Sequence, residues 1–286
     1  MQERIGVAGL GNMGTAIAAR LAAQGWSVSG WTRSGVDQAW AEAQVITPHE
    51  TLEALVAASD IVLLSLFDDA AIASVLDRML KHDLRGKLIV DTSTANPSTL
   101  KGYAESIATA GAGVLDAPVS GWPKVVSAGK AGVFIGGAAG DVARFTLVAG
   151  QFANRVFHVG SLGQGLAAKI VNNMMLATYW QALHETLAVG RSLGLSGEIM
   201  LDILTSGPAA NGTLAGKAKV ILGEDGPPSF TVAGIAKDLA IYREVAAAGG
   251  VEAPALQAAF EGFTRFRDAG NADRDFATLP GAALKE

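Results

Sequence analysis

Residues 4–14 read Arg-Ile-Gly-Val-Ala-Gly-Leu-Gly-Asn-Met-Gly, a short apolar run followed at once by glycines spaced G-x-G-x-x-G. The run Arg4–Ala8 is typical of a strand. Apolar residues at helical spacing continue through Thr15–Gln24, and Trp26–Trp31 alternates like a second strand. This order predicts a strand–turn–helix–strand unit at the start of an α/β domain.

The three glycines suit a turn that holds a dinucleotide. The first permits a tight turn, the second lets a pyrophosphate approach the backbone, and the third lets the helix pack closely on the strand. A glycine-rich turn without a ligand is the alternative in a chain with 35 glycines, but the position of the motif between a strand and a helix favours the nucleotide site. Its binding residues are expected to be Gly9, Leu10, Gly11, Asn12, Met13 and Gly14.

The end of the second strand distinguishes two cofactors. NAD sites usually place an acidic residue there, about 20 residues after the glycines, to bond the ribose 2′-hydroxyl. This chain has Trp31-Thr32-Arg33-Ser34 instead, and no acid until Asp37. Arg33 can pair with a 2′-phosphate and Ser34 can donate a hydrogen bond to it, although a solvated surface arginine is the alternative. We therefore expect NADP(H) rather than NAD(H), with Thr32, Arg33 and Ser34 on the cofactor.

Strand-like and helical stretches alternate through the rest of the first half. The predicted strands are Ile61–Leu66, Lys87–Val90, Gly113–Leu115 and Gly132–Ile135, and helices Ala70–Leu84 and Thr99–Ala110 separate several of them. This alternation predicts a Rossmann-type α/β domain, a doubly wound parallel sheet with helices on both faces.

The pattern changes after Gly165. The stretch Leu166–Leu193 contains no Pro and one Gly, with apolar residues three and four apart. A helix of about 28 residues would be roughly 42 Å long, enough to connect two domains. The remainder is typical of helices with loops at Thr205–Gly212 and Gly223–Ser229. We predict two domains, residues 1–161 and an all-α domain of residues 162–286.

Composition excludes several classes of protein. The chain has 286 residues, a net charge of −5 and no cysteine, which excludes disulfides and thiolate chemistry. Its 22 Lys and Arg are scattered, which argues against nucleic-acid binding. The chain has no run of 18 uncharged apolar residues, the length that a membrane-spanning helix needs. We therefore expect a cytoplasmic protein. The four histidines lack metal-ligand spacing, so no metal is expected.

Small and polar residues gather where strands should end, the edge at which α/β folds bind ligands. The segments are Leu66-Phe67-Asp68-Asp69, Asp91-Thr92-Ser93-Thr94 and Asp116-Ala117-Pro118-Val119-Ser120-Gly121. The two acids in the first segment are expected to cap the helix that follows. In the long helix, Lys169, Asn172 and Asn173 share one face. On the pattern alone, a structural hydrogen-bond network and a functional site are equally open for these three.

These motifs together resemble those of the β-hydroxyacid dehydrogenases, of the 3-hydroxyisobutyrate dehydrogenase and tartronate semialdehyde reductase type. The resemblance covers nearly the whole chain. It rests on Gly9–Gly14, Asp91–Thr94, Asp116–Gly121, the segment from Gly160 to Asn173, and Phe230 with Lys237-Asp238-Leu239. The family fold that it implies, a Rossmann domain, a long connecting helix and a helical C-terminal domain, usually paired as a dimer, agrees with the predicted layout.

The resemblance also implies roles for individual residues. Lys169 matches the catalytic lysine, and Asn173 a substrate-orienting amide beside Asn172. Ser120 and Gly121 match the loop that holds the substrate carboxylate. On the cofactor, Thr94 and Lys237 match contacts to the nicotinamide end and Leu66 and Phe67 lie on the adenosine-ribose side, while Asp238 would orient Lys237.

The departure from the family is Trp122, since a small residue usually follows the Ser-Gly pair. A tryptophan there would shrink the pocket, reshape it for a larger substrate, or turn outward. The expected reaction is hydride transfer between NADP(H) and a small β-hydroxy acid or its semialdehyde, with Lys169 as general acid/base. The alternatives are an NADPH-dependent imine reductase, which usually lacks this lysine, and a non-catalytic nucleotide-binding scaffold.

Overall fold

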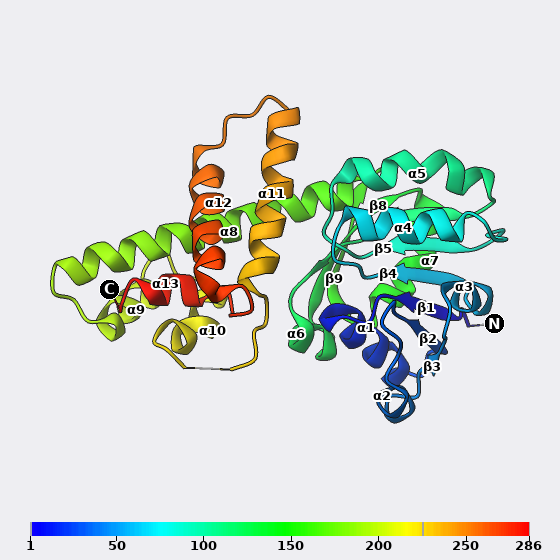
Figure 1. Ribbon diagram of the computed structural model, residues 1–286, viewed down its shortest axis with the longest axis horizontal. Helices are drawn as coiled ribbons and strands as arrows, with labels where there is room; N and C mark the ends of the chain where they lie inside the picture. Colours follow the sequence, from blue (N-terminus) through cyan, green and yellow to red (C-terminus); the bar gives the residue numbers. More distant parts are fainter. Residues whose placement is uncertain (1, 225, 286) are drawn as a thin grey trace. The chain divides into compact units, whose positions relative to one another are not determined.

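A computed structural model describes residues 2–224 and 226–285 of the chain (Figure 1). The chain divides into two compact units, Met1–Ile170 and Val171–Glu286. The division falls within helix α8 (Gln164–Ser192), whereas the sequence analysis places it near Ser161, before that helix.

The first unit is built on a nine-stranded sheet with the order β3-β2-β1-β4-β5-β6-β8-β7, and β9 pairs with β8. Pairing is parallel from β3 to β6, while β8 runs antiparallel to β6 and β7 and parallel to β9. The strands are β1 (Ile5–Ala8), β2 (Val28–Trp31), β3 (Thr47–Pro48), β4 (Ile61–Leu64), β5 (Leu88–Asp91), β6 (Gly113–Asp116), β7 (Val119–Ser120), β8 (Ala131–Gly137) and β9 (Ala153–Gly160). The order 3-2-1-4-5-6 is that of the Rossmann fold, which confirms the predicted fold class. Strands β8 and β9 run opposite to the other strands, so the sheet is mixed and not parallel throughout as expected.

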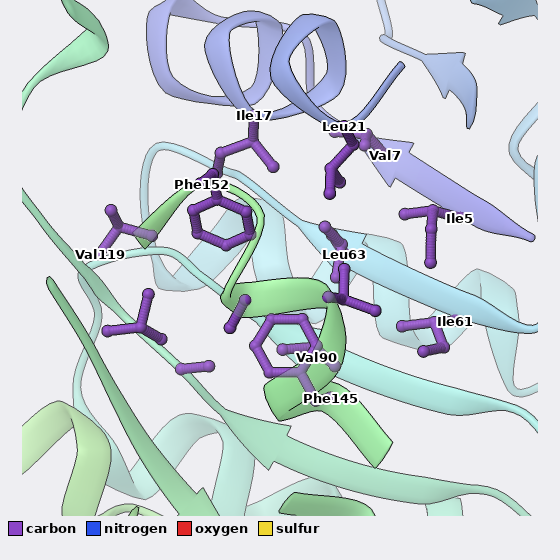
Figure 2. Packing of buried hydrophobic residues seen from close by; sticks show 14 of the residues in the cluster. Ile5, Val7, Ile17, Leu21, Ile61, Leu63, Val90, Val119, Phe145 and Phe152 are labelled. Atoms are coloured by element: carbon purple, nitrogen blue, oxygen red, sulfur yellow. The ribbon is translucent and has the colours of Figure 1, made fainter. Parts of the chain in front are cut away.

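Helices cover both faces of this sheet. They are α1 (Asn12–Ala23), α2 (Gln38–Ala43), α3 (Leu52–Ala58), α4 (Asp69–Met79), α5 (Pro97–Thr109), α6 (Pro123–Ser127) and α7 (Ala139–Ala149). Alternate residues of the buried strands point to opposite faces, so each strand contributes to two cores. One core lies under α1, α6 and α7, as the packing of Ile17, Phe145 and their neighbours shows (Figure 2). The other lies under α3, α4 and α5.

The second unit consists of helices. After the rest of α8 come α9 (Gly197–Ser206), α10 (Gly212–Ile221), α11 (Val232–Ala248), α12 (Pro254–Phe266), the π-helical turn η1 (Arg267–Asn271) and α13 (Thr278–Ala282). Trp180 is fully buried and meets the ring of Phe276 edge-on at 4.9 Å between centroids. The prediction of an all-α second domain is confirmed. Residue 225, in the predicted loop Gly223–Ser229, lies outside the described residues.

No helix among the described residues is both long and apolar enough to cross a membrane. Of the two acids expected to cap α4, Asp68 does so and Asp69 instead binds the beginning of α5. Asp68 is the N-cap of α4 and accepts a hydrogen bond from the Ala71 N–H at 2.8 Å. Asp69 accepts hydrogen bonds from the Asn96 N–H and the Thr99 hydroxyl.

Candidate active site

The glycine-rich turn between β1 and α1 is shaped by close contacts at its first and third glycines. Gly9 has a φ of +102°, a conformation that favours glycine. A side chain at Gly9 would clash with the carbonyl oxygen of Ser65, and one at Gly14 would clash with the carbonyl oxygen of Gly9. Both glycines therefore serve the tight approach of turn, helix and neighbouring strand.

The middle glycine faces open space. Apart from Gly11 itself, its chain neighbours and the adjoining helix backbone, no atom of the described residues lies within 4 Å of the position that a Gly11 side chain would take. Gly11 is the N-cap of α1, a helix whose first turn carries no acidic residue. Free backbone N–H groups at a helix N-terminus, with no carboxylate beside them, attract phosphate. The turn thus fits the pyrophosphate of a dinucleotide, while Leu10 and Met13 pack against the core behind it.

The end of β2 carries an exposed cation and hydroxyl. Arg33 and Ser34 are exposed, Thr32 is half-buried, and the Gly35 N–H closes the turn by donating to the Thr32 carbonyl at 3.1 Å. The first acid after this strand, Asp37, is the N-cap of α2 and accepts a hydrogen bond from the Trp40 N–H. Its carboxylate is therefore engaged in capping a helix.

Hydrogen bonds tie the loops after β4 and β5 together. The Leu66 N–H donates to the Ser93 hydroxyl at 2.9 Å, and the Thr92 hydroxyl donates to the Leu64 carbonyl at 2.7 Å. Phe67 is 63% exposed and Thr94 is half-buried. The loops on which the resemblance places the cofactor contacts of Leu66, Phe67 and Thr94 thus form one connected edge of the first unit.

Two acids stand side by side at this edge, because Asp91 and Asp116 are partners in the register of β5 and β6. Asp91 is fully buried; its Oδ1 accepts the Ser93 N–H at 2.9 Å, and its Oδ2 has no hydrogen-bond partner among the described residues. Burial raises the pKa of Asp91 to about 6, with a further contribution from the charge of Asp116. Asp91 belongs to one of the predicted strand-end segments, but the unpaired Oδ2 is not evident from the sequence.

Asp116 holds the beginning of helix α8. Its two carboxylate oxygens accept hydrogen bonds from the Gly163 N–H at 2.7 Å and the Leu166 N–H at 2.6 Å. Burial raises the pKa of Asp116, while these two backbone hydrogen bonds oppose that rise. Side chains at Gly136 or Gly165 would collide with Asp116 or the strands beside it. The glycines before Lys169 therefore let the helix start against the sheet.

Lys169 follows one turn after this anchored start. Its side chain is buried, with the residue 7% exposed, and its Nζ donates a hydrogen bond to the Val119 carbonyl at 2.7 Å. That carbonyl belongs to the peptide bond that leads into Ser120. The structure thus places the predicted catalytic lysine beside the predicted carboxylate loop, both within the first unit.

The carboxylate loop itself turns at Gly121, where φ is +139°. Ser120 is half-buried, and Trp122 is half-buried at the N-cap of α6, its carbonyl accepting from the Val125 and Val126 N–H groups. Part of Trp122 is therefore covered, and its effect on the pocket stays a prediction.

A second polar network lies within the second unit. The side chains of Asn173 and Tyr242 are hydrogen-bonded to each other. The Tyr242 hydroxyl also donates a hydrogen bond to Asp238 Oδ2 at 3.3 Å. The other oxygen of Asp238 lies 2.9 Å from Lys237 Nζ, as the resemblance implies. Burial and the charge of Asp238 hold the pKa of Tyr242 well above its usual range. The network therefore connects Asn173 on α8 with Lys237 on α11.

Tyr242 and the role of Asp116 were not predicted from the sequence. Tyr242 stands four residues after Asp238, a spacing that puts the two on one helix face, and that signal was available. Asn172 is exposed, and its amide donates to the Asn173 side chain at 2.9 Å. The predicted nicotinamide contacts fall in different units, Thr94 in the first and Lys237 in the second.

Two family models cover the chain. The model described as the NAD binding domain of 6-phosphogluconate dehydrogenase matches residues 4–160. The model described as "NAD-binding of NADP-dependent 3-hydroxyisobutyrate dehydrogenase" matches residues 163–282. The chain belongs to the β-hydroxyacid dehydrogenase family. Members of this family are NAD(P)-dependent oxidoreductases, and the resemblance seen in the motifs is confirmed.

Relatives and solved structures agree with the family. The chain is 30% identical to 2-(hydroxymethyl)glutarate dehydrogenase of Eubacterium barkeri, over 96% of this chain and 93% of that protein. A structure of Mycobacterium tuberculosis 3-hydroxyisobutyrate dehydrogenase with L-serine superposes with a TM-score of 0.87 at 27% identity, covering 99% of both chains. The fold is also that of a reductive aminase from Aspergillus terreus, with a TM-score of 0.65, 21% identity and 98% of both chains covered.

Proposed function

We propose that the chain catalyses reversible hydride transfer between NADP(H) and a small β-hydroxy acid or its semialdehyde, with Lys169 as the general acid/base. The observation that carries the proposal is the buried Lys169 amine, held at the Val119 carbonyl beside the Ser120 loop. A dinucleotide at the glycine turn supplies or accepts the hydride when it is bound.

Lys169 moves the proton. In reduction, its ammonium gives a proton to the oxygen of the substrate carbonyl while the carbonyl carbon receives the hydride. In oxidation, the neutral amine takes the hydroxyl proton. A buried amine gives up its proton more readily than an exposed one, which suits proton exchange near neutral pH. Ser120 and Gly121 hold the substrate carboxylate, and Asn173 orients the reacting group.

The end of β2 supports the proposed preference for NADP(H). Arg33 and Ser34 are exposed there, and the nearest acid after the strand, Asp37, is engaged in capping α2. A guanidinium binds a phosphate through paired, charge-assisted hydrogen bonds, whereas the ribose 2′-hydroxyl of NAD has no acid at this strand end to accept its hydrogen bond.

An imine is the alternative substrate, because the fold is shared with a reductive aminase and the half-buried Trp122 adds an apolar face beside the loop. The acid/base at position 169 favours a hydroxy acid instead, and also disfavours a scaffold without catalysis. NADPH absorbance with a panel of semialdehydes, glyoxylate and cyclic imines separates the three. Turnover of the imines alone would support the imine reductase, and turnover of none would support the scaffold.

The test of the acid/base is Lys169→Met, which keeps the length and apolar stem of the side chain. We expect turnover of semialdehyde to fall by at least a hundredfold, while NADPH binding, followed by fluorescence, changes little. The matched control is Lys81→Met, at an exposed lysine. Wild-type turnover in Lys169→Met would show that another group moves the proton.

We propose in addition that the protein is a homodimer. Large apolar side chains are exposed along α8, α9 and the turn between them in the second unit, and such surfaces mark contacts with other proteins. They are Val171, Met175, Val189, Leu193, Ile199 and Ile203. Light scattering after gel filtration should give twice the mass of 29.2 kDa, and a monomeric mass would refute the proposal.

A further inference from the structure

We propose that Arg155 on β9 is a specificity-determining residue, whose guanidinium binds the substrate carboxylate together with Ser120. This inference rests on the proposed function and adds a cation to the carboxylate loop. The residues that support this inference lie on strands β7, β8 and β9, which all belong to the first unit.

Ser120, Gly132 and Arg155 form one row across these strands. Ser120 pairs with Gly132, and Gly132 pairs with Arg155. The point that a Gly132 side chain would occupy lies 3.3 Å from the Ser120 Cβ and 3.7 Å from Arg155 Nη2. The serine and the guanidinium are therefore separated by no more than these two distances together, and the glycine leaves the space between them open.

An irregularity in the strand pairing places the arginine in this row. Ala131 pairs with Ala153, but the next residue of β8, Gly132, pairs with Arg155, because the register shifts between Ala131 and Gly132. Asn154 is the extra residue. Bulges of this kind re-aim side chains. Regular pairing would put Asn154 opposite Gly132 and turn Arg155 to the other face of the sheet.

The surroundings of the guanidinium suit an anion with a hydrocarbon body. Across the described residues, Arg155 has no acidic side chain in ion-pair contact and no hydrogen-bond partner. Two residues further along each strand, Phe134 and Phe157 stack with ring centroids 5.9 Å apart. Lys169 lies at the Val119 carbonyl, one residue before Ser120. Two cations thus flank the serine, and no carboxylate among the described residues neutralises Arg155.

The gap between serine and guanidinium accommodates one carboxylate group. The planar fork of arginine matches a carboxylate with two parallel hydrogen bonds of about 2.8 Å each. A carboxylate that accepts these bonds can also accept one from the Ser120 hydroxyl across Gly132. The substrate class that follows is a carboxylate with its reacting aldehyde or alcohol a short distance away, toward Lys169.

The experiment compares succinic semialdehyde with its uncharged methyl ester in Arg155→Gln. We expect KM for the semialdehyde to rise by about 10-fold to 100-fold with kcat within about threefold of wild type, because a lost charge-assisted hydrogen bond weakens ground and transition states alike. The kcat and KM for the ester should change by less than about twofold. Arg155→Lys, which keeps the charge without the fork, should lie between the two.

Two variants complete the design. Arg85→Gln removes the same charge at an exposed position beside the amino end of β5, and should leave all kinetics unchanged. Gly132→Val places a strand-compatible side chain between Ser120 and Arg155, and should raise KM for the semialdehyde while both residues are present. NADPH binding and the melting temperature report whether any variant is misfolded.

The outcomes separate the two proposals. Wild-type turnover of the semialdehyde with an unchanged KM in Arg155→Gln would overturn the role of Arg155 and leave the proposed function intact. An equal rise of KM for semialdehyde and ester in Arg155→Gln would also overturn the role of Arg155, because the residue would then not recognise the charge of the carboxylate. A wild-type enzyme inactive with every carboxylate aldehyde would overturn both.

Discussion

Asp116 holds the beginning of helix α8 and so fixes the position of Lys169 without contacting it. This role can be tested with a substitution at Asp116. Asp116→Asn keeps the size and shape of the side chain but offers one acceptor oxygen where the carboxylate offers two. The Gly163 and Leu166 N–H groups each take one of those oxygens now. In the variant, one of these buried N–H groups must face an amide N–H and stay without an acceptor.

The magnitude follows from that unpaired group. A buried donor left without a partner costs about 1–3 kcal/mol, and the neutral amide recovers part of the burial penalty that raises the pKa of Asp116. We expect the free energy of unfolding to fall by about 1–2 kcal/mol. Lys169 lies three residues after Leu166, so a shift of the first helical turn by about 1 Å should also lower kcat by roughly tenfold to a hundredfold.

Urea unfolding and steady-state kinetics with saturating NADPH measure the two effects. The matched control is Asp83→Asn, an exposed carboxylate paired with Arg85, which should change the unfolding free energy by less than about 0.5 kcal/mol. A wild-type kcat in Asp116→Asn, alongside a normal fold, would show that Asp116 does not position Lys169. So would a loss confined to the affinity for NADPH, since Asp116 acts on the helix that carries Lys169.

Three further predictions concern other groups. The pKa of Asp91 is raised to about 6 from 3.8 in the folded protein, so its contribution to stability is full below pH 3.8 and is lost as the pH rises through about 6. The gain in unfolding free energy of Asp91→Asn over wild type should therefore grow by about 2 kcal/mol between pH 4 and 7, and a constant difference in urea titrations would contradict this. Arg33→Ala should raise KM for NADPH by about 10-fold to 100-fold and leave KM for NADH unchanged, and equal changes for both cofactors would count against a 2′-phosphate contact. Tyr242→Phe keeps the buried ring but unties Asn173 from Asp238, so kcat should fall by about tenfold with the dissociation constant of NADPH unchanged; an unaltered kcat would leave the hydroxyl a structural role only.

Local patterns carried most of the fold prediction. The G-x-G-x-x-G turn and the runs Ile61–Leu66 and Lys87–Val90 were readable because strand, turn and helix propensities act over a few neighbouring residues. The two-residue strands β3 and β7 were missed, since two residues show no period. The antiparallel course of β8 was missed as well, because the direction of a strand depends on its partner and not on its own side chains.

Some residues of the candidate site could likewise be predicted from local sequence patterns, and others could not. Lys169 and Asn173 stood out as polar residues on one face of an apolar helix, and Ser120 as a polar residue at the end of a predicted strand. The function of Asp116 could not be seen, since its partners are 47 and 50 residues away along the chain. Arg155 was equally hidden, because an alternating strand pattern gives no sign of an extra residue. Contacts distant in sequence are set by the packing of whole elements, and motif spacing does not record them.

The proposed reaction delivers a hydride from the nicotinamide to the carbonyl carbon of a carboxylate-bearing aldehyde. It is tested most directly with NADPH that carries deuterium at the transferable position of the nicotinamide ring. Mass spectrometry of the hydroxy acid formed from succinic semialdehyde should show one deuterium, bound to the carbinol carbon. A product without deuterium, or no product while a cyclic imine is reduced with deuterium uptake, would contradict the claim.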